Sequence, residues 1–577
     1  MNRKLFKSIR EYKKESILAP IFVILEVFME VLIPFQMSKI IDIGIMNQDL
    51  NYIIKVGLSL VVLAMLALFF GVKAGNYAAT AGAGYAKNLR HDIFYKVQDF
   101  SFKNIDNFST SSLVTRMTTD ITNVQMAYMM SIRLLARAPF MIILSMIMTV
   151  QLNKQIALLF LITIPILGGL LIFIAKKAHP HFIKVFDEYD ILNNTVQENV
   201  NASRVVKAYV REDHEIEKFH KISAVVYRLF TKAEKIVAWN SPVMQFTMYV
   251  VILCIVLISG KAIVFGSMES GQLTSVIVYA LQILMSLMMV TFVFVMIMIA
   301  EASTDRITEV LDEVPEMQNK PNAIKEVPNG DIDFENVDFS YAGEGGNLSL
   351  KQVDLHIKSG QTIGIIGGTG SSKSTLVQLI PRLYDVTKGS VKVGGIDVRE
   401  YDLEALRDQV SMVLQKNVLF SGTIYENIRW GNENATDEEV QHVCKLAQAD
   451  SFVQEFPKGY DTMIVQGGNN VSGGQKQRLC IARALLKKPK ILILDDSTSA
   501  VDTKTDAMIR KAFREEIPDT TKIIIAQRVS SIEDADQIIV LDDGKINGIG
   551  TSEELLKTNE IYREVYESQM KGGNEDE

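Results

Sequence analysis

Residues 364–375 read Gly-Ile-Ile-Gly-Gly-Thr-Gly-Ser-Ser-Lys-Ser-Thr, and the apolar stretch Leu-Val-Gln-Leu-Ile follows directly. This pattern predicts a strand, a glycine-rich loop and then a helix. In that context the loop binds phosphate groups, because N–H groups at the start of a helix point toward an anion. The second half of the chain is therefore expected to contain an α/β nucleotide-binding domain of the P-loop NTPase type.

The phosphate loop supplies two side chains with distinct roles. Lys373 is expected to reach the β- and γ-phosphates, and the Ser374 hydroxyl is expected to ligate Mg²⁺. Most loops of this type have glycine immediately before the lysine, whereas this chain has Ser372. If that position requires a positive φ, a serine there is strained. The nucleotide-binding residues predicted in the loop are Gly367, Gly368, Thr369, Gly370, Ser371, Ser372, Lys373, Ser374 and Thr375.

A second informative run, at residues 491–496, reads Ile-Leu-Ile-Leu-Asp-Asp. Four consecutive apolar residues predict a strand that is buried on both faces. Two carboxylates at the end of such a strand suit a site for Mg²⁺ and a nucleotide. Asp495 is expected near the metal and Asp496 near the γ-phosphate.

The N-terminal half of the chain is strongly apolar and contains six stretches long enough to cross about 30 Å of hydrocarbon. The connections 79–131 and 178–241 are long, rich in both charge signs and helical in periodicity, so the helices are expected to continue beyond the bilayer. The other connections are short and poor in Lys and Arg. The positive-inside rule therefore places both long connections, the N-terminus and the soluble half in the cytoplasm. The predicted spans are 17–40, 54–78, 132–152, 156–177, 242–265 and 271–300.

Charged residues are rare within the predicted spans, but Glu26 and Glu30 share one helix face in the first span. An acidic residue inside a membrane is commonly functional, which here predicts an attraction for cationic substrates. The alternative is a structural pair that neighbouring helices satisfy. Arg133 and Arg137 near the third span could be its partners or could extend to the membrane interface.

Composition and length narrow the possibilities further. The chain has 577 residues, more than one typical domain, and its net charge of −7 without a basic cluster argues against nucleic-acid binding. The basic N-terminal segment predicts a short amphipathic helix on the inner membrane surface, with a disordered tail as the alternative. The expected fold is multi-domain, with an all-α polytopic membrane domain of six transmembrane helices and an α/β cassette. The predicted domains are an N-terminal helix at 1–15, a transmembrane domain at 16–305, a linker at 306–330, a nucleotide-binding domain at 331–566 and an acidic tail at 567–577.

The segment Val471-Ser472-Gly473-Gly474-Gln475-Lys476-Gln477-Arg478 resembles the signature motif of ATP-binding-cassette (ABC) transporters. With six spans before one cassette, nearly the whole chain resembles a half-transporter of the ABC exporter type. Members of this family bind ATP with Mg²⁺ as dimers, and each ATP lies between one subunit's phosphate loop and the other subunit's signature motif. The resemblance implies an ATP hydrolase coupled to transport across a membrane.

Further residue roles are implied by the resemblance alone. Tyr341 would stack on adenine, a contact worth about 1–3 kcal/mol, although it could also be a plain strand residue. Gln415 would lie near Mg²⁺, Asp495 would hold the metal through water, and Asp502 would contact the opposing site across the dimer. The residues implied for the partner's ATP are Ser472, Gly473, Gly474 and Gln475. Those implied for the metal are Ser374, Gln415 and Asp495. The segments implied as coupling helices are 107–121 and 198–210.

Two catalytic positions depart from the family's pattern. Asp496 stands where the family has a catalytic glutamate, and one methylene less withdraws the carboxylate by about 1.5 Å. A misplacement near 1 Å costs on the order of 10²-fold in rate. Gln527 stands where the family has a histidine that contacts the γ-phosphate, and glutamine cannot carry its charge. The chain's own site is therefore expected to hydrolyse ATP slowly or only to hold it.

The unaltered signature motif together with the altered catalytic positions favours a heterodimer. A homodimer would have two impaired sites, whereas a second half-transporter with the usual glutamate and histidine would provide one fast site. Gln466-Gly467-Gly468 replaces the Gly-Glu-Arg-Gly that is common in homodimeric exporters, in agreement with a specialised subunit.

The leading hypothesis is a multidrug-type exporter subunit that moves hydrophobic or amphipathic compounds out of the cytoplasm or inner leaflet by alternating access. A lipid or lipopeptide flippase is the alternative with the same architecture, and a regulatory ATP-binding subunit without transport is the alternative from another class. The expected location is the cell membrane (plasma or inner membrane), as a multi-pass protein with its N-terminus and nucleotide-binding domain in the cytoplasm. The expected partners are a second half-transporter, membrane lipids and a hydrophobic small molecule, but no nucleic acid.

Overall fold

The structure, a computed structural model, describes residues 5–497 and 500–572 and separates the chain into two units. One unit comprises Met1–Gln98 and Ser109–Glu313, and the other comprises Asp99–Phe108 and Val314–Glu577. Residues 1–4 of the predicted N-terminal helix and residues 573–577 of the predicted acidic tail lie outside the described part of the chain.

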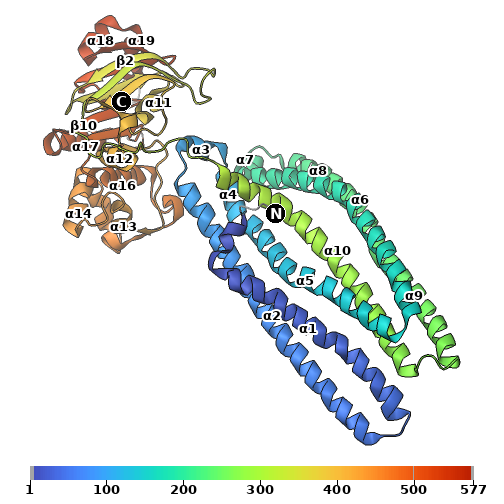
Figure 1. Ribbon diagram of the computed structural model, residues 1–577. Coiled ribbons are helices and arrows are strands. Elements are labelled where there is room, and N and C mark those ends of the chain that lie inside the picture. Colours follow the sequence, from blue (N-terminus) through green and yellow to red (C-terminus); the bar gives the residue numbers. More distant parts are fainter. Residues whose placement is uncertain (1–4, 498–499, 573–577) are drawn as a thin grey trace. The chain divides into compact units, whose positions relative to one another are not determined.

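The first unit is built from long helices (Figure 1). These are α1 (Lys13–Lys39), α2 (Leu50–Gln98), α5 (Ile121–Leu152), α6 (Lys154–Asn201), α8 (Glu212–Val237), α9 (Asn240–Val264) and α10 (Ser270–Asp312). The shorter elements are η1 (Leu5–Tyr12), η2 (Ile40–Ile45), α4 (Thr110–Thr115), η3 (Arg116–Asp120) and α7 (Ser203–Ala208). Six helical segments among the described residues are long and apolar enough to cross a membrane, which confirms the predicted number of spans. They are Leu5–Ile45, Leu50–Gln98, Thr110–Leu152, Lys154–Asn201, Glu212–Val264 and Ser270–Asp312.

The helices extend well beyond the thickness of a bilayer, as the periodicity of the long connections predicts. α2 has 49 residues, which corresponds to ~74 Å at 1.5 Å per residue, whereas the hydrocarbon layer is ~30 Å thick. The buried residues of α2 begin at Ala74 and continue to Ile93. The part of α2 beyond the predicted second span is therefore packed against other helices of the unit.

The N-terminal segment forms the short helix η1, which packs against α2. Leu5 and Ser8 are buried. The Ser8 hydroxyl donates to Asp92 Oδ2 (2.7 Å), and Asn88 Nδ2 donates to the Ser8 carbonyl oxygen (2.9 Å). Phe6 remains 42% exposed. The helix is thus fixed to the protein through its buried residues, and its contact with the membrane stays a prediction.

The predicted start of the linker at 306 lies inside a helix, because α10 continues to Asp312. Ile307 is fully buried, and Arg306 Nε donates to the buried Asp120 Oδ2 (2.8 Å). These tertiary contacts stabilise a charged stretch that, by composition alone, looks like a connection. The chain leaves the first unit for its last time after Glu313, not at residue 306.

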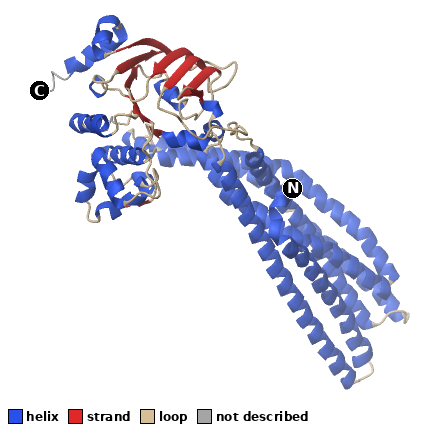
Figure 2. Ribbon diagram, turned by 60° about the vertical axis from the view of Figure 1, so that its left-hand side comes forward, coloured by secondary structure: helices blue, strands red, loops and turns tan. Residues whose placement is uncertain are grey.

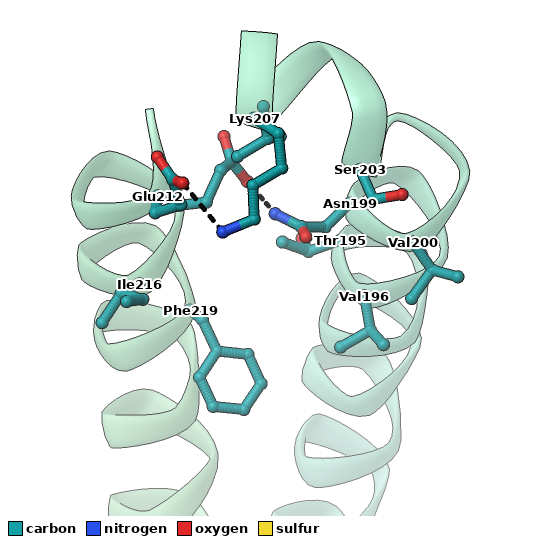
Figure 3. Close-up of a pocket in the computed structure, with 11 residues that line it drawn as sticks. Thr195, Val196, Asn199, Val200, Ser203, Lys207, Glu212, Ile216 and Phe219 are labelled. Atoms are coloured by element: carbon teal, nitrogen blue, oxygen red, sulfur yellow. Dashed lines mark hydrogen bonds and ion pairs between the residues drawn. The ribbon is translucent and has the colours of Figure 1, made fainter. Parts of the chain in front are cut away.

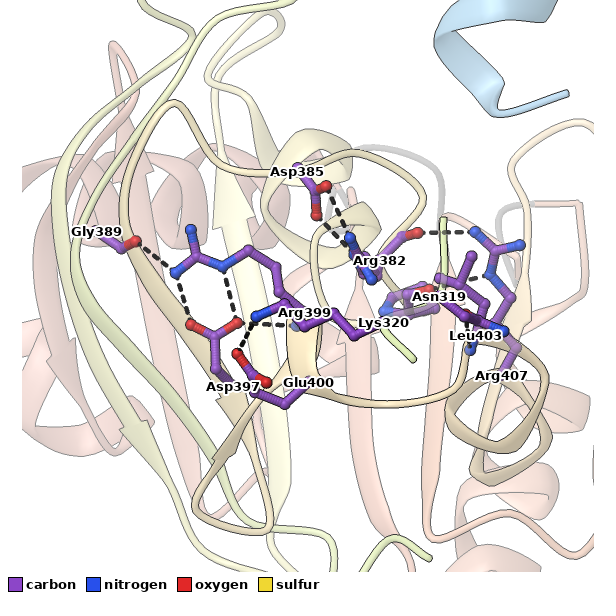
Figure 4. A network of polar contacts seen from close by, with 11 residues as sticks. Asn319, Lys320, Arg382, Asp385, Gly389, Asp397, Arg399, Glu400, Leu403 and Arg407 are labelled. Atoms are coloured by element: carbon purple, nitrogen blue, oxygen red, sulfur yellow. Dashed lines mark hydrogen bonds and ion pairs between the residues drawn. The ribbon is translucent and has the colours of Figure 1, made fainter. Parts of the chain in front are cut away.

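The remainder of the linker is bound to the cassette rather than free. Ile324 forms a parallel bridge with Tyr401. Lys320 forms an ion pair with Glu400, as Figure 4 shows. The linker residues after Glu313 therefore pack against the second unit.

The second unit is an α/β cassette with two main sheets (Figure 2). The larger sheet has the order β12-β11-β3-β10-β9-β6 and is parallel except for β12, which runs antiparallel to β11. Its strands are β3 (Thr362–Gly367), β6 (Val410–Val413), β9 (Ile491–Asp495), β10 (Thr521–Ile525), β11 (Gln537–Asp542) and β12 (Lys545–Gly550). The antiparallel smaller sheet has the order β2-β1-β4-β5, with β1 (Ile332–Phe339), β2 (Leu350–Ile357), β4 (Lys388–Val393) and β5 (Ile396–Asp397). β7 (Gly422–Thr423) and β8 (Met463–Ile464) form a separate pair.

Helices surround these sheets. The longer ones are α14 (Asp437–Leu446), α16 (Gly473–Leu486), α17 (Thr503–Glu516) and α19 (Glu560–Gly572). The shorter ones are α3 (Phe102–Asn107), α11 (Lys373–Gln378), α12 (Leu403–Gln409), α13 (Ile424–Ile428), α15 (Asp450–Glu455) and α18 (Ser552–Thr558). Single turns complete the unit at η4 (Val398–Glu400), η5 (Gly459–Asp461), η6 (Gln466–Gly468) and η7 (Val529–Ser531).

Strand β9 is buried on both faces, as its sequence predicts. Leu492 and Leu494 belong to one hydrophobic core, whereas Ile491 and Ile493 belong to another. Alternate residues of a strand point to opposite faces, so the two cores lie on the two sides of the sheet. The strand thereby fixes Asp495 at its carboxyl end, which is the edge where parallel sheets bind ligands.

The cassette unit includes one helix from the N-terminal half, α3. The Tyr384 hydroxyl donates to Asp106 Oδ2 (2.8 Å), and the ring of Tyr384 meets Phe102 edge-on, with 6.0 Å between ring centroids. Asn104 Nδ2 donates to the Val314 carbonyl oxygen (3.2 Å). A mixed aromatic and polar contact thus holds α3 on the cassette.

The first predicted coupling segment, 107–121, is divided between the two units, and its docking role stays a prediction. The residues that join the cassette are 99–108, and the chain from Ser109 belongs to the first unit. Ser109 does start a helix, because its hydroxyl accepts from the Ser112 N–H (3.2 Å). That helix start marks where the chain returns to the first unit. The second predicted segment, 198–210, contains α7.

Candidate nucleotide-binding site

The phosphate loop lies between β3 and α11, in the predicted order of strand, loop and helix. β3 ends at Gly367 and α11 begins at Lys373. A Cβ atom at Gly367 would lie 2.1 Å from the Leu541 carbonyl oxygen, so a larger residue is excluded there. The close approach to β11 makes the turn tight, and the N–H groups at the start of α11 are then available to an anion.

Ser372 adopts a left-handed backbone conformation, with φ 71° and ψ 28°. The residue before the lysine thus needs a positive φ, as the usual glycine at this position suggests. A non-glycine residue in this conformation costs on the order of 1 kcal/mol. The loop keeps its shape despite the serine, but it carries this strain.

The Lys373 ammonium group is held over the loop by oxygen atoms of the loop itself. Nζ donates to the carbonyl oxygens of Gly367 (2.9 Å) and Gly368 (2.8 Å) and to the Ser371 hydroxyl (3.3 Å). Burial lowers the pKa of this lysine, and nearby carboxylates oppose the shift. A cation beside a loop of N–H groups is an arrangement that suits a polyphosphate.

A hydroxyl group and a buried carboxylate lie together beside the loop. Ser374 Oγ donates to Asp495 Oδ1 (2.9 Å). Asp495 is 3% exposed, and burial raises its pKa, although the hydrogen bond from Ser374 lowers it. Hard oxygen ligands such as these are the ones Mg²⁺ prefers, and a divalent cation would compensate the buried negative charge. The residues present therefore fit a magnesium ion.

Asp496 and Gln527 follow two neighbouring strands and contact each other directly. Asp495 pairs with Ile525 in the register of β9 and β10, which brings the next residues together. Gln527 Nε2 donates to Asp496 Oδ2 (2.7 Å), and Gln415 Nε2 lies 3.5 Å from the same oxygen. Asp496 has φ 49° and is 8% exposed. One carboxylate oxygen at the strand ends therefore has two amide neighbours.

Tyr341 contacts α11, where its hydroxyl is 3.1 Å from Thr375 Oγ1. Tyr384 meets its ring edge-on, with 5.1 Å between ring centroids. Tyr341 is 44% exposed, so part of its ring is open to a ligand. Burial of the remainder raises the pKa of the phenol, which stays neutral at physiological pH. An anchored, half-exposed ring is suitable for stacking on a base.

The predicted nucleotide-binding side chains come together around one cavity of about 620 Å³. The one predicted loop residue that is not among those lining the cavity is Ser371, which is buried at 4% exposure. The predicted residues that line the cavity are Tyr341, Gly367, Gly368, Thr369, Gly370, Ser372, Lys373, Ser374, Thr375, Gln415, Asp495, Asp496 and Gln527.

Four further lining residues escape prediction from the sequence: Ser349, Ile366, Ile525 and Val565. Ile366 is the second-last residue of β3, which leads to the phosphate loop, and Ile525 is the last residue of β10, which leads to Gln527, so the strand pattern could have located them. Val565 belongs to α19, far along the chain. No sequence signal connects that helix with the site.

The signature segment forms the start of α16, which is another part of the cassette. The Ser472 hydroxyl accepts from the Gln475 N–H (3.2 Å), and Gln475 Oε1 accepts from the Ser472 N–H (2.9 Å). Gly474 lies close to Ala500, because a Cβ there would be 2.7 Å from its carbonyl oxygen. Asp502 similarly caps α17. Among the described residues that line the cavity, none comes from the signature segment, and the role of that segment at a partner's site stays a prediction.

In the membrane unit, Arg137 of α5 pairs with both acidic residues of α1. Arg137 Nη1 donates to Glu26 Oε1 (2.7 Å), and Nη2 donates to Glu30 Oε2 (2.6 Å). Arg133, one turn earlier, is exposed. The structure therefore favours the interpretation in which a neighbouring helix supplies a cation to both carboxylates, and the attraction for cationic substrates stays a prediction.

A second cavity, of about 400 Å³, lies between the ends of α6 and α8 in the same unit (Figure 3). Lys207 Nζ donates to Glu212 Oε1 (2.8 Å), and Asn199 Nδ2 donates to Glu215 Oε2 (3.0 Å). Apolar side chains such as Phe219 line the cavity below these contacts in the view of Figure 3. Part of the predicted coupling segment 198–210 thus contributes to this cavity, and its docking role stays a prediction.

Comparisons with known proteins cover nearly the whole chain. The family model described as ABC transporter transmembrane region matches residues 16–287, and the one described as ABC transporter matches residues 350–499. The uncharacterized ABC transporter ATP-binding protein YfiB of Bacillus subtilis (strain 168) is 38% identical over 567 residues, which is 98% of each chain. The ATP-dependent lipid A-core flippase of Desulfotalea psychrophila is 31% identical over 573 residues, 98% of this chain and 99% of that protein. A solved structure, that of a bacterial Atm1-family ABC exporter with ATP bound, has the same fold, with a TM-score of 0.85 and 24% identity over 96% of this chain and 99% of that one.

Proposed function

Because the chain belongs to the ABC transporter family, with a six-helix membrane domain fused to one ATP-binding cassette, we propose that it is one subunit of a heterodimeric, ATP-driven exporter. Its cargo is a hydrophobic or amphipathic compound, moved out of the cytoplasm or inner leaflet by alternating access. The protein lies in the cell membrane with its N-terminus and cassette in the cytoplasm. The basic N-terminal segment and the charged long connections support this orientation.

The cavity of the cassette is the ATP site of this proposal. Tyr341 stacks on the adenine, and the loop from Gly367 to Thr375 binds the phosphates through its N–H groups. Lys373 exchanges its contacts with loop oxygens for contacts with the β- and γ-phosphates. Ser374 and Asp495 hold Mg²⁺, which neutralises phosphate charge when it is bound.

The hydrogen bond of 2.7 Å from Gln527 Nε2 to Asp496 Oδ2 is the observation that carries the proposal of a slow site. The two altered catalytic positions engage each other, so the carboxylate oxygen that would accept a proton from water is already bonded to an amide. The shorter aspartate also leaves its oxygens about 1.5 Å short of where a glutamate would place them. A displacement of that size supports a loss on the order of 10²-fold in hydrolysis while binding persists.

The signature segment supports the proposal of a heterodimer. Ser472 and Gln475 form a regular helix cap, and the glycines between them keep their close approach to Ala500. This chain can therefore complete a nucleotide site on a partner, although its own site is altered. A partner with the usual glutamate and histidine would then supply the fast site of the pair.

An exposed apolar face on α10 supports a hydrophobic cargo. Met285, Met288 and Phe292 are each more than half exposed in the single chain and share one helix face by their spacing. Flexible methionine side chains adapt to ligands of different shape. The relative that is a lipid A-core flippase supports a second candidate cargo, a lipid that crosses from one leaflet to the other.

The test begins with the full chain alone in lipid nanodiscs. We expect it to bind ATP but to hydrolyse it slowly. Co-purification from native membranes should identify a second half-transporter with glutamate at the position equivalent to Asp496, and the mixed dimer should hydrolyse ATP fast. Fast hydrolysis by this chain alone would contradict the slow site. Vesicle assays with a fluorescent drug and with a labelled lipid would then distinguish the two cargoes.

A further inference from the structure

The C-terminal helix α19 (red in Figure 1) reaches the nucleotide site, although no motif of the sequence connects it with nucleotide chemistry. Its residue Val565 lines the cavity, and Gln569 lies one turn later on the same helix face. The helix is seated on the cassette near its start, where Tyr562 is fully buried and its N–H donates to Asn559 Oδ1 (2.9 Å). α19 is therefore a part of the site's wall.

Gln569 binds the backbone of the segment that carries Gln527. Its Nε2 donates to the Gln527 carbonyl oxygen (2.8 Å), and its Oε1 accepts from the Val529 N–H (2.8 Å). Both distances are those of well-formed hydrogen bonds. One side-chain amide thus bonds to the backbone on both sides of Arg528, as a neighbouring strand would.

These two hydrogen bonds fix the direction in which the side chain of Gln527 leaves the backbone. The Gln527 carbonyl group belongs to the peptide unit that adjoins its own Cα, so holding that oxygen restricts the rotation of the residue. The side chain of Gln527 then reaches Asp496 Oδ2 at 2.7 Å. We call these two hydrogen bonds of Gln569 the clamp. If the clamp opened, the backbone at Gln527 could rotate, and a shift near 1 Å is enough to break the contact between Gln527 and Asp496.

On the basis of the function proposed above, we propose that Gln569 is a positioning residue for the γ-phosphate side of the site and that α19 regulates how tightly the chain retains ATP. With α19 seated, Gln527 is held toward Asp496 and the nucleotide is enclosed. With α19 displaced, the segment 526–531 is loosened and ATP leaves faster. Occupancy of the slow site is thereby linked to the end of the chain.

Hydrogen exchange of the full chain in lipid nanodiscs tests the clamp itself. The peptide covering 526–531 is followed by mass spectrometry in the wild type, in Gln569→Ala and in the control Ser568→Ala, an exposed neighbour on the same helix. We expect the Val529 amide to exchange about fivefold faster in Gln569→Ala, the scale of one net hydrogen bond. Ser568→Ala should exchange like the wild type. Unchanged exchange in Gln569→Ala would overturn the clamp.

Nucleotide binding by the same variants tests the regulation. We expect the Kd for a fluorescent ATP analogue with Mg²⁺ to rise about fivefold to tenfold in Gln569→Ala. Gln569→Glu keeps the acceptor for Val529 but loses the donor to Gln527, so its Kd should fall between those of the wild type and the alanine variant. Faster exchange with unchanged affinity would overturn the regulatory role. The slow-site proposal fails separately, by fast ATP hydrolysis in the wild-type chain, which would leave both of these results as they are.

Discussion

Gln527 Nε2 donates a hydrogen bond to Asp496 Oδ2 over 2.7 Å and so joins the two residues that the sequence comparison with the family's catalytic pattern predicts to be altered. The effects of mutating two residues in direct contact do not simply add. The two residues should therefore be changed together rather than one at a time.

We expect the double change Asp496→Glu with Gln527→His to raise ATP hydrolysis by the chain alone on the order of 10²-fold, because it restores the reach of the carboxylate and a chargeable group. Steady-state phosphate release in nanodiscs measures the rate. Each single change should give much less, since the longer glutamate would meet the unchanged glutamine amide. A third change, Asp495→Asn, should abolish the gain. No increase in the double variant would mean that the chain is inactive for another reason.

Replacing Ser372 by glycine should relieve the strain of its left-handed backbone conformation. Relief of this strain is worth about 1 kcal/mol. Glycine also makes the unfolded chain more flexible, and this entropic cost cancels all but a few tenths of a kcal/mol of the gain. A small rise in Tm is therefore expected. ATP should also bind slightly more tightly, because the loop is held with less strain. The matched control is Ser371→Gly, which removes a buried hydroxyl near Lys373 and should lower Tm. The expected result is therefore a rise in Tm for Ser372→Gly and a fall in Tm for Ser371→Gly.

Arg137→Met should strongly destabilise the membrane unit, because it leaves Glu26 and Glu30 without their cation in an apolar environment. Breaking a fully buried pair costs about 3–5 kcal/mol, and this partly buried group should lose somewhat less because its side chains stay 12–28% exposed. Thermal unfolding in detergent measures the loss. Adding Glu26→Gln and Glu30→Gln should recover most of it, and Arg133→Met, at the exposed position one turn earlier, should change little. A stable Arg137→Met single variant would show that the ion pairs contribute little to folding.

The buried carboxyl group of Asp495 predicts a pH-dependent stability. Burial raises its pKa in the folded state above the ordinary value of about 3.9. The folded state therefore holds the proton more tightly, and this contribution to stability is lost as the pH rises through the raised pKa. Asp495→Asn should accordingly be more stable than the wild type at pH 7, and the difference should shrink as the pH falls. The same variant should lose Mg²⁺-dependent ATP binding, measured with the fluorescent analogue. A variant less stable at pH 7 would contradict this reasoning.

The elements that could be predicted from the sequence are those determined by local patterns. The apolar run before Asp495 is a strand buried on both faces, because every residue in it is apolar and no turn residue interrupts it. The phosphate loop follows from the strand, the glycines and the lysine in order. The six apolar spans could be predicted equally well, because the thickness of the membrane sets their minimum length.

The elements that could not be predicted depend on contacts between distant residues. α10 continues past residue 306 because Arg306 bonds to Asp120, a partner far away in the chain. α3 docks on the cassette through Tyr384 and Asp106, and neither residue belongs to a motif. Val565 and Gln569 reach the nucleotide site from the last helix for the same reason. Local sequence patterns do not indicate which helices and strands come into contact in the folded chain.

The contact between Gln527 and Asp496 also bears on how this chain can evolve. Aspartate and glutamate differ only at the third codon position, and so do glutamine and histidine, so each reversal is a single mutational step. Each step alone, however, produces a mismatched pair with little gain in rate, and selection has little to act on. In the heterodimer proposed above, we therefore expect both residues to be retained once both changes have been fixed. The catalytic residues of the proposed partner would then come under correspondingly stricter selection.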